Sequence, residues 1–405
     1  MQFYEFKETQ ERVILIGVQT EVGDDVEASL DELEELAETA GAETVAKVIQ
    51  NREAVHPGTY IGKGKIEEVA SLLRALDANG VICDDELSPA QLNNLERELD
   101  CKVMDRTLLI LDIFAGRAVS SEGKIQVELA QLRYRAARLV GLRESLSRLG
   151  GGIGTRGPGE KKLETDRRLI RTRISALKAE LAQVEKHREL IRGKRSRGNL
   201  KTAAIVGYTN AGKSTLLNTL TGAGILAEDK LFATLDPTTR VLELKDGQQI
   251  LLTDTVGFIR KLPHHLVEAF KSTLEEAKYA DYIIHVVDAS NPQAELQMFT
   301  VYETLRELGA TGKKIVTLMN KQDQVTGSGI RDLKADYTVK CSARTGEGLD
   351  EFKDVLAKLL AEDQIYLEEL YPYSEAGKIQ KIREFGTLLS EEYREDGIFV
   401  KARVP

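Results

Sequence analysis

One octapeptide contains the residue types needed to hold a nucleoside triphosphate. Residues 207–214 read GYTNAGKS, which fits the pattern G-x-x-x-x-G-K-S/T. Glycines let backbone N–H groups curl around the phosphates, Lys213 neutralises the β- and γ-phosphates, and Ser214 is a ligand for Mg²⁺. A strand-like TAAIV precedes the loop and a helix-like STLLNTL follows it, which is the required context. The predicted phosphate contacts are Gly207, Tyr208, Thr209, Asn210, Ala211, Gly212, Lys213 and Ser214.

Three further motifs follow in the order that a GTP site needs. LLTDTVGF places Asp254 at a strand end, where it can hold the Mg²⁺ shell, and then Gly257, whose N–H can contact the γ-phosphate. TLMNKQD ends in Asp323, whose carboxylate can accept from the N1 and N2 donors of guanine, which adenine does not offer. CSAR supplies backbone that can meet the guanine O6. Four motifs in order at strand ends of one α/β unit predict a GTP site. The other residues assigned to it are Thr255, Val256, Asn320, Lys321, Gln322, Ser342, Ala343 and Arg344.

The stretch KLFATLDPTTR lies between the phosphate loop and DTVG. One threonine in it must reach Mg²⁺ when GTP is bound and withdraw on hydrolysis, which makes an order–disorder switch. The candidates are Thr234, Thr238 and Thr239. Together with Lys213 and Gly257, this threonine is expected to support the hydrolysis step.

Phe258 follows the DTVG glycine, at the place where Ras-like enzymes carry a glutamine that orients the attacking water. Phenylalanine does not perform that task. We therefore expect slow intrinsic hydrolysis, with the catalytic group supplied by another loop, a cation or a partner. The amide oxygen of Asn210, beside the phosphates, suggests K⁺ as that cation.

The elements that position these motifs belong to a multidomain α/β chain of 405 residues. Residues 1–115 alternate strand-like runs such as RVILIGV and GVICD with helical patterns, which predicts a small α/β domain. A Gly62-Lys63-Gly64 turn in it precedes a helix and could hold a phosphate, although it lacks the full phosphate-loop pattern. Residues 199–362 are expected to form the GTPase domain with a mostly parallel sheet, and 363–405 a small α+β domain.

Residues 116–198 carry apolar residues at heptad spacing in two blocks, which predicts an antiparallel helical hairpin. Its arms would be roughly 40 and 50 Å long at 1.5 Å per residue. The first block is Ile125, Leu129, Leu132, Ala136 and Leu139, and the second is Ile170, Ile174, Leu177, Leu181 and Val184.

The tip of this hairpin, residues 150–160, reads GGGIGTRGPGE. Gly152, Gly154 and Gly157 match a dinucleotide-binding fingerprint, but a helix rather than a strand precedes them, which fails the structural context. Two interpretations stay open: a mobile hinge, or a surface that approaches a partner closely and offers Arg156 to a phosphate.

Charge and composition limit the classes of partner. The chain has a net charge of −9, yet residues 117–200 hold 21 lysines and arginines against 9 acidic residues, which suggests a polyanionic partner for the hairpin. No apolar run approaches the ~20 residues that span a bilayer. The three cysteines, Cys83, Cys101 and Cys341, form no metal-binding pair and are expected to be reduced thiols of a cytoplasmic protein.

The chain resembles the HflX GTPases over nearly its whole length. The resemblance is carried by GYTNAGKST, LFATLDPTTR, DTVGFIRKLPHHLVEAFKSTLEE and MNKQD, and also by GGGIGTRGPGEKKLETDRR, VELAQLRYRAARL and HPGTYIGKGK. The glycine-rich segment is more diagnostic than the GTPase motifs, which many translational GTPases share. Phe258 is the usual hydrophobic substitution in this family.

This resemblance implies a partner and a reaction. The family binds the 50S ribosomal subunit, hydrolyses Mg²⁺-GTP with ribosomal stimulation, and splits stalled or idle 70S ribosomes, notably in heat stress. Its hairpin tip approaches 23S rRNA, which assigns Gly152, Gly154, Arg156 and Gly157 to rRNA contact. The family pattern assigns Thr234 to Mg²⁺ together with Ser214, and it places Phe232, Ala233, Leu235 and Asp236 at the nucleotide.

Several alternatives stay open within the resemblance. A GTP-gated assembly or rRNA-binding module would share the same motifs without splitting 70S particles. Some family members use ATP through the N-terminal domain, and the Gly62-Lys63-Gly64 turn neither supports nor excludes this. We expect a monomer with no membrane span.

Overall fold

The computed structural model describes residues 11–20, 25–149, 158–197, 200–222, 231–245, 247–262, 271–325 and 330–404. The chain forms two compact units. Unit 1 contains Met1–Val184 together with Asp229–Asp236 and Arg260–Lys271, and unit 2 contains the rest. Two short segments of the GTPase sequence therefore pack within unit 1. The four-part division of the chain at residues 115, 198 and 362 stays a prediction.

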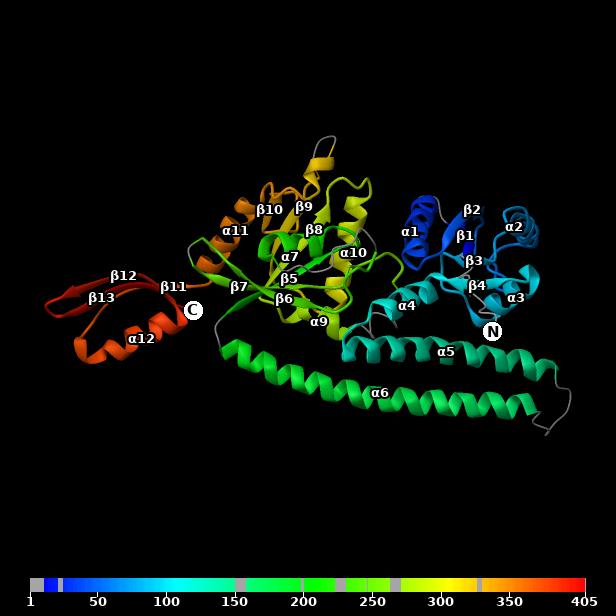
Figure 1. Ribbon diagram of the computed structural model, residues 1–405, viewed down its shortest axis with the longest axis horizontal. Helices are drawn as coiled ribbons and strands as arrows, with labels where there is room; N and C mark the ends of the chain where they lie inside the picture. Colours follow the sequence, from blue (N-terminus) through cyan, green and yellow to red (C-terminus); the bar gives the residue numbers. More distant parts are fainter. Residues whose placement is uncertain are drawn as a thin grey trace, which may run out of the picture. The chain divides into compact units, whose positions relative to one another are not determined.

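Unit 1 is built on a four-stranded parallel sheet of order β2-β1-β3-β4 (Figure 1). The small α/β domain expected from the sequence is confirmed, because the apolar runs RVILIGV and GVIC are buried strands. Sequence inspection missed the helices that follow β3 and β4. The strands are β1 (Arg12–Gln19), β2 (Glu43–Asn51), β3 (Gly80–Cys83) and β4 (Lys102–Asp105), and the helices are α1 (Val26–Thr39), α2 (Lys63–Ala75), α3 (Pro89–Leu99) and α4 (Arg106–Arg117).

The helical hairpin is also confirmed. Helix α5 (Ser121–Leu149) and helix α6 (Pro158–Arg197) run side by side in opposite directions, about 44 and 60 Å long at 1.5 Å per residue (Figure 1). Arg173 and Glu128 join the two arms with a bidentate ion pair of 2.7 and 2.8 Å. Within residues 164–184 of α6, the shielded positions are Arg167 and the five predicted heptad residues Ile170, Ile174, Leu177, Leu181 and Val184.

Helix α5 has a second buried face that the heptad pattern did not indicate. Val127, Ala130 and Tyr134 are buried, and α5 packs against both α3 and α4. The Tyr134 hydroxyl donates to Asp105, which also accepts from Arg138. The first arm is therefore fastened to the N-terminal sheet as well as to α6.

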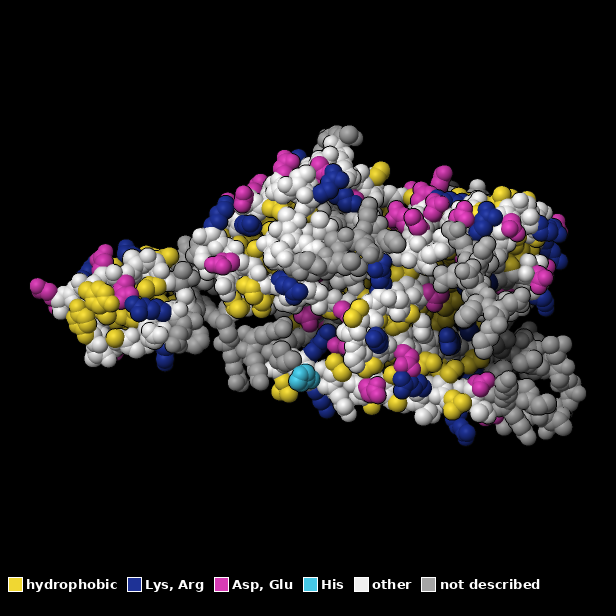
Figure 2. All heavy atoms as spheres, viewed as in Figure 1, with side chains coloured by type: hydrophobic (Ala, Val, Ile, Leu, Met, Phe, Trp, Pro, Cys, Tyr) yellow, Lys and Arg dark blue, Asp and Glu magenta, His cyan; other side chains and the backbone are white. Residues whose placement is uncertain are grey.

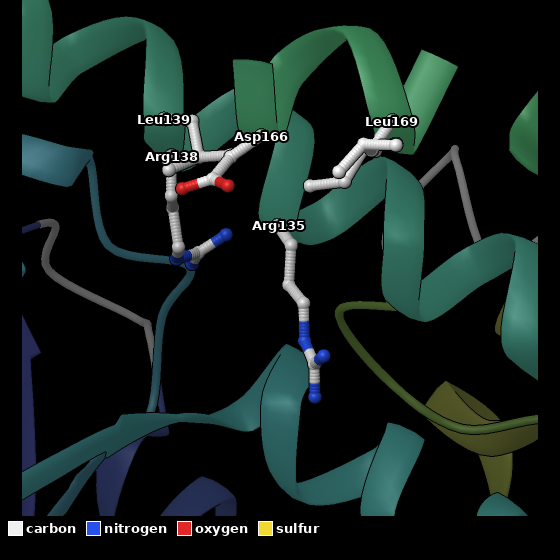
Figure 3. A pocket seen from close by; sticks show the side chains of 6 residues that line it. Arg135, Arg138, Leu139, Asp166 and Leu169 are labelled. Carbon is white, nitrogen blue, oxygen red and sulfur yellow. The ribbon is translucent and has the colours of Figure 1, made fainter. Parts of the chain in front are cut away.

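A cavity of about 490 Å³ lies between the arms of the hairpin. Leu139 of α5 and Leu169 of α6 line its apolar part, while Arg135 and Arg138 extend from α5 (Figure 3). The Arg138 guanidinium stacks on the Tyr134 ring, with its carbon 3.1 Å from the ring centroid. Arg138 is thus engaged inside the protein, whereas Arg135 is exposed.

The Gly62-Lys63-Gly64 turn begins α2, but its surroundings are already occupied. The Gly62 N–H donates to Gln50 Oε1 at 2.9 Å. A Cβ at position 62 would lie 2.6 Å from an Arg52 guanidinium nitrogen. A phosphate site at this turn stays a prediction.

Unit 2 contains a six-stranded sheet of order β10-β9-β8-β5-β7-β6, in which only β6 runs antiparallel to its neighbour. The mostly parallel sheet predicted for the GTPase domain is confirmed. Its strands are β5 (Lys201–Gly207), β6 (Thr238–Glu243), β7 (Gln249–Asp254), β8 (Tyr282–Asp288), β9 (Lys314–Asn320) and β10 (Tyr337–Lys340), and its helices are α7 (Lys213–Thr221), α9 (Lys271–Tyr279), α10 (Ala294–Glu307) and α11 (Leu349–Glu362).

The C-terminal part of unit 2 is the expected α+β element. Strands β11 (Ile365–Tyr371), β12 (Thr387–Arg394) and β13 (Gly397–Val404) form an antiparallel sheet of order β11-β13-β12, and α12 (Ala376–Phe385) packs on it. Tyr371, Ile379 and Val400 lie in its core. Across the part of the chain that the structure describes, no helix is long and apolar enough to cross a membrane.

Candidate nucleotide site

The carboxyl ends of the central parallel strands gather the predicted motifs of unit 2. The phosphate loop follows β5, Asp254 ends β7, and Asn320 ends β9. Because these strands are parallel, their carboxyl ends lie at one edge of the sheet, where α/β proteins bind ligands. The sheet order therefore brings together residues that are more than a hundred positions apart in the sequence.

The phosphate loop has the backbone conformation that its glycines suggested. Gly212 has φ +95° and directly precedes α7, while Asn210 has φ +58°. A Cβ at position 212 would lie 2.4 Å from the Asn320 side-chain nitrogen, which donates to Ala211 O at 2.8 Å. Glycine is thus required here by both conformation and close approach. Helix α7 points its N-terminus at the loop, which favours an anion there.

Lys213 is buried at the base of this loop. Its Nζ donates to Tyr208 O at 2.7 Å. Burial lowers the pKa of the Lys213 ammonium to about 8, and the Asp254 carboxylate opposes this shift. A Cβ on Gly257 would lie 2.9 Å from this Nζ, so the DTVG glycine gives the ammonium its space. Phosphate groups bound beside Lys213 would favour its protonated form and raise its pKa again.

Ser214 and Asp254 form the candidate magnesium position. The Ser214 hydroxyl donates to Asp254 Oδ2 at 2.7 Å, and the Asp254 carboxylate is fully buried. A hydroxyl oxygen beside a carboxylate oxygen is the hard-oxygen chemistry that Mg²⁺ prefers. The side chains of Ser214 and Asp254 therefore fit a Mg²⁺ ion.

Phe258 has a structural role beside the phosphate loop. Its N–H donates to Gly207 O at 3.1 Å, and its carbonyl accepts from Thr209 N at 2.7 Å. The ring is 1% exposed. Thr255 contacts the strand that precedes the loop, since its hydroxyl donates to Ile205 O of β5 at 2.7 Å. Val256, between them in the chain, is also buried.

The base-recognition residues form a connected group. The Asp323 carboxylate accepts from Ser342 Oγ at 2.7 Å and pairs with Arg344. The hydrogen bond from Ser342 lowers the pKa of Asp323. Partial burial acts in the opposite direction, and the charge of Arg344 lowers the pKa further. Asn320 Oδ1 accepts from Ala343 N at 2.8 Å, so one asparagine bridges the phosphate loop and the CSAR loop. Gln322, the remaining member of this motif, donates to Met319 O.

Asp288 is a residue that motif inspection missed. It ends β8, and its carboxylate pairs with Lys321 Nζ at 2.7 Å. Ser290 holds the same carboxylate, with its N–H at 3.0 Å and its hydroxyl at 2.6 Å. An aspartate that directly follows the apolar run YIIHVV was the available signal.

The predicted switch threonines lie in two different settings. Thr239 is fixed in β6, where its hydroxyl lies 3.0 Å from that of Thr253, and Thr238 is paired opposite Asp254 in the same ladder. Thr234 belongs instead to the segment that packs in unit 1. Its assignment to Mg²⁺ stays a prediction.

The neighbours of Thr234 make defined contacts within unit 1. Leu231, Phe232 and Leu235 are buried, and Ala233 is partly exposed. The Phe232 ring meets that of Phe114 edge-on, with centroids 4.6 Å apart. The Asp236 carboxylate accepts hydrogen bonds from the N–H groups of Val119 and Ser120, the two residues directly before α5. The nucleotide contacts predicted for these residues stay predictions, as do the rRNA contacts of Gly152, Gly154, Arg156 and Gly157, which lie outside the described residues.

The fold and the site together define a P-loop GTPase: a mostly parallel sheet, a glycine loop closed by a buried lysine, and an aspartate beside the CSAR loop. Comparison with known families agrees. Three family descriptions match in sequence: GTP-binding GTPase N-terminal at residues 27–115, GTP-binding GTPase Middle Region at 117–195, and 50S ribosome-binding GTPase at 202–321.

Whole-chain relatives make the assignment more specific. The chain is 69% identical over 402 residues to the GTPase HflX of Lacrimispora saccharolytica, covering 99% of this chain and 95% of that one. It is 42% identical over 400 residues to the GTPase HflX of Escherichia coli, covering 98% and 94%. A solved complex of SsGBP with GDP is 27% identical, with a TM-score of 0.50, covering 86% of this chain and 98% of that one. The chain belongs to the HflX family of GTPases.

Proposed function

We propose that this GTPase binds the 50S ribosomal subunit and splits stalled or idle 70S ribosomes. The observation that carries the proposal is the basic hairpin beside a complete set of GTP motifs. Exposed Arg168, Arg171 and Lys178 lie along α6, and Figure 2 shows lysine and arginine side chains along the hairpin, interspersed with acidic ones. The family description of residues 202–321 as a 50S ribosome-binding GTPase supports the same partner.

The glycine-rich tip at residues 150–160 is the proposed contact with 23S rRNA. In the sequence this segment joins the two long antiparallel helices α5 and α6. The excess of lysine and arginine over acidic residues in 117–200 favours a phosphate backbone over a protein surface. The proposed setting is the cytoplasm, where ribosomes are, with heat stress as the condition of greatest demand.

Mg²⁺ is the proposed cofactor. Ser214 and Asp254 would hold it, together with Thr234, and the bound ion would neutralise charge developing on the β- and γ-phosphates. Lys213 neutralises the same phosphates from the buried side of the loop. K⁺ is the proposed additional cation, with Asn210 as its ligand, because Phe258 offers no group that orients water. Equal turnover in NaCl and KCl would end the K⁺ proposal.

A ribosome profile tests the splitting function directly. Purified 70S particles are mixed with the protein and a non-hydrolysable GTP analogue and then separated on a sucrose gradient. We expect 70S to be converted to free subunits. The matched control is Lys213→Ala, which removes the phosphate contact and should leave 70S intact. If 70S particles persist with wild-type protein bound to them, splitting is refuted, and a GTP-gated assembly or rRNA-binding module is the better description.

A further inference from the structure

The Asp236 carboxylate lies at the N-terminus of α5, the first arm of the hairpin. It accepts hydrogen bonds from Ser120 N at 2.8 Å and from Val119 N at 3.1 Å. The Ser120 hydroxyl also donates to it. Ser120 Oγ in turn accepts from Gly123 N at 2.9 Å. Asp236 therefore completes the cap of α5, although more than a hundred residues separate the two in sequence.

Two physical effects stabilise this contact. The first turn of a helix carries backbone N–H groups without partners inside the helix, and a side-chain oxygen that accepts from them stabilises the helix. The positive end of the helix dipole also favours a carboxylate over a neutral acceptor. Ser120 Oγ is the acceptor for Gly123 N in the first turn, while Asp236 holds Ser120 through its N–H and hydroxyl and places a negative charge near the start of α5.

Gly123 is shaped for this approach. A Cβ at position 123 would lie 2.7 Å from Asp236 Oδ1 and 3.1 Å from Ser120 Oγ. A glycine inside a helix is unfavourable relative to alanine. Its presence in the first turn of α5 is explained by the space that the Asp236 carboxylate needs.

Residues 231–235, directly before Asp236, also pack within unit 1. Phe232 is buried and packs edge-on against Phe114 of α4, while Leu231 and Leu235 are 3% exposed. Thr234 lies between these anchors, two residues before Asp236. Two residues of extended chain span at most about 7 Å, so any movement that takes Thr234 farther than this from the present position of Asp236 must displace Asp236 as well.

We propose that Asp236 is a positioning residue that couples the threonine-bearing segment to the first turn of α5. When the segment reorders with the nucleotide, the cap on α5 is formed or released, so the hairpin senses whether GTP or GDP is bound. This inference rests on the proposed role of Thr234 as the Mg²⁺ threonine. It does not require that the protein split ribosomes.

Hydrogen exchange on the full-length protein alone tests the coupling. Exchange is measured at the amides of residues 119–124, with GDP bound and with a non-hydrolysable GTP analogue bound. We expect at least a fivefold difference in exchange rate between the two states, the factor that loss of one helix cap produces. Equal exchange in both states would overturn the proposal, whatever the ribosome profiles show.

Gly123→Ala provides the matching perturbation, because it displaces the carboxylate without changing Asp236. Gly116→Ala, in α4, is the control, since a Cβ there meets nothing within 4 Å. We expect Gly123→Ala to abolish the nucleotide-dependent difference, with GDP affinity unchanged within twofold, and Gly116→Ala to retain the difference. If Gly123→Ala unfolds the protein, Ser120→Ala, which removes the hydroxyl from the same network, is measured instead. A full nucleotide-dependent difference in the folded variant would show that Asp236 does not carry the coupling.

Discussion

The buried ammonium of Lys213 makes nucleotide binding depend on pH. Its pKa falls from 10.5 to about 8 because burial disfavours the charge. A difference of roughly 2.5 pKa units corresponds to about 3 kcal/mol for keeping Lys213 charged in the ligand-free fold. A lysine with a lower pKa when folded binds its proton less tightly than in the unfolded chain. The ligand-free protein therefore gains stability as pH rises from about 8 to about 10.5, since the unfolded state binds more protons there.

Phosphates reverse this effect, because two or three negative charges beside Lys213 favour the ammonium form. Binding of GDP should take up a proton wherever the free lysine is neutral, which means above pH 8. Relative to pH 7, affinity should fall about twofold at pH 8 and about tenfold at pH 9 through this one group. Below pH 7 the lysine is charged in both states and contributes no pH dependence.

Titration calorimetry measures this uptake. GDP is titrated in two buffers of different ionisation enthalpy at pH 7, 8 and 9, and the difference in heat gives the number of protons bound. We expect almost none at pH 7, about half a proton at pH 8 and about nine-tenths at pH 9. Lys213→Arg is the control, because a guanidinium stays charged throughout this range. Any proton bound or released by the guanine base is measured in this variant as well and can be subtracted. Absence of uptake at pH 9 in the wild type, or equal uptake in Lys213→Arg, would refute the assigned role of Lys213.

Three other substitutions address separate parts of the molecule. Asp323→Asn should weaken GTP binding by roughly 10- to 100-fold, the range for losing a charged hydrogen-bond acceptor, and should strengthen binding of xanthosine triphosphate. Competition binding with both nucleotides measures this change. Unchanged selectivity would contradict the assignment of Asp323 to the base. Asp84→Asn removes the 2.9 Å carboxylate partner of the buried Arg106, which keeps its ion pair with Glu32, and should cost about 3 kcal/mol, the lower end of the range for breaking a buried pair. Urea unfolding measures this cost, and one under about 1 kcal/mol would contradict it. Arg168→Glu should make the slope of log ribosome affinity against log salt concentration shallower by about one, the value for losing one phosphate contact. Lys381→Glu, at an exposed position on α12, is the control and should leave that slope unchanged.

The sequence was most informative where a function depends on local chain geometry. The phosphate loop was predictable because glycines at fixed spacing and a flanking strand and helix form one continuous segment. The heptad residues of α6 were predictable for the same reason, since a helix places residues three and four apart on one face. In both cases the relevant neighbours are close in sequence.

Contacts between distant segments were not predictable from local patterns. Arg138 belongs to the basic stretch of residues 117–200, and the sequence gave no sign that Asp105 holds it inside unit 1. Asp236 was assigned to the nucleotide from the FATLD pattern, which stays a prediction, and that pattern gave no sign of its hydrogen bonds to Val119 and Ser120 before α5. Asp288 reads as an ordinary strand end, yet it pairs with Lys321. Each partner is set by sheet order and helix packing, which no spacing rule encodes.

Phe258 connects these two kinds of information. Its identity alone indicated that no glutamine orients water at this position, and its geometry shows which other role the residue has. The backbone of Phe258 bonds to both Gly207 and Thr209, and its ring is fully buried, so this position supports the phosphate loop. The expectation that another loop, a cation or a partner supplies the group that orients water therefore stays a prediction. If hydrolysis is slow without the partner, the GTP-bound protein lasts long enough for the proposed change at the Asp236 contact to alter the start of α5 before the partner binds.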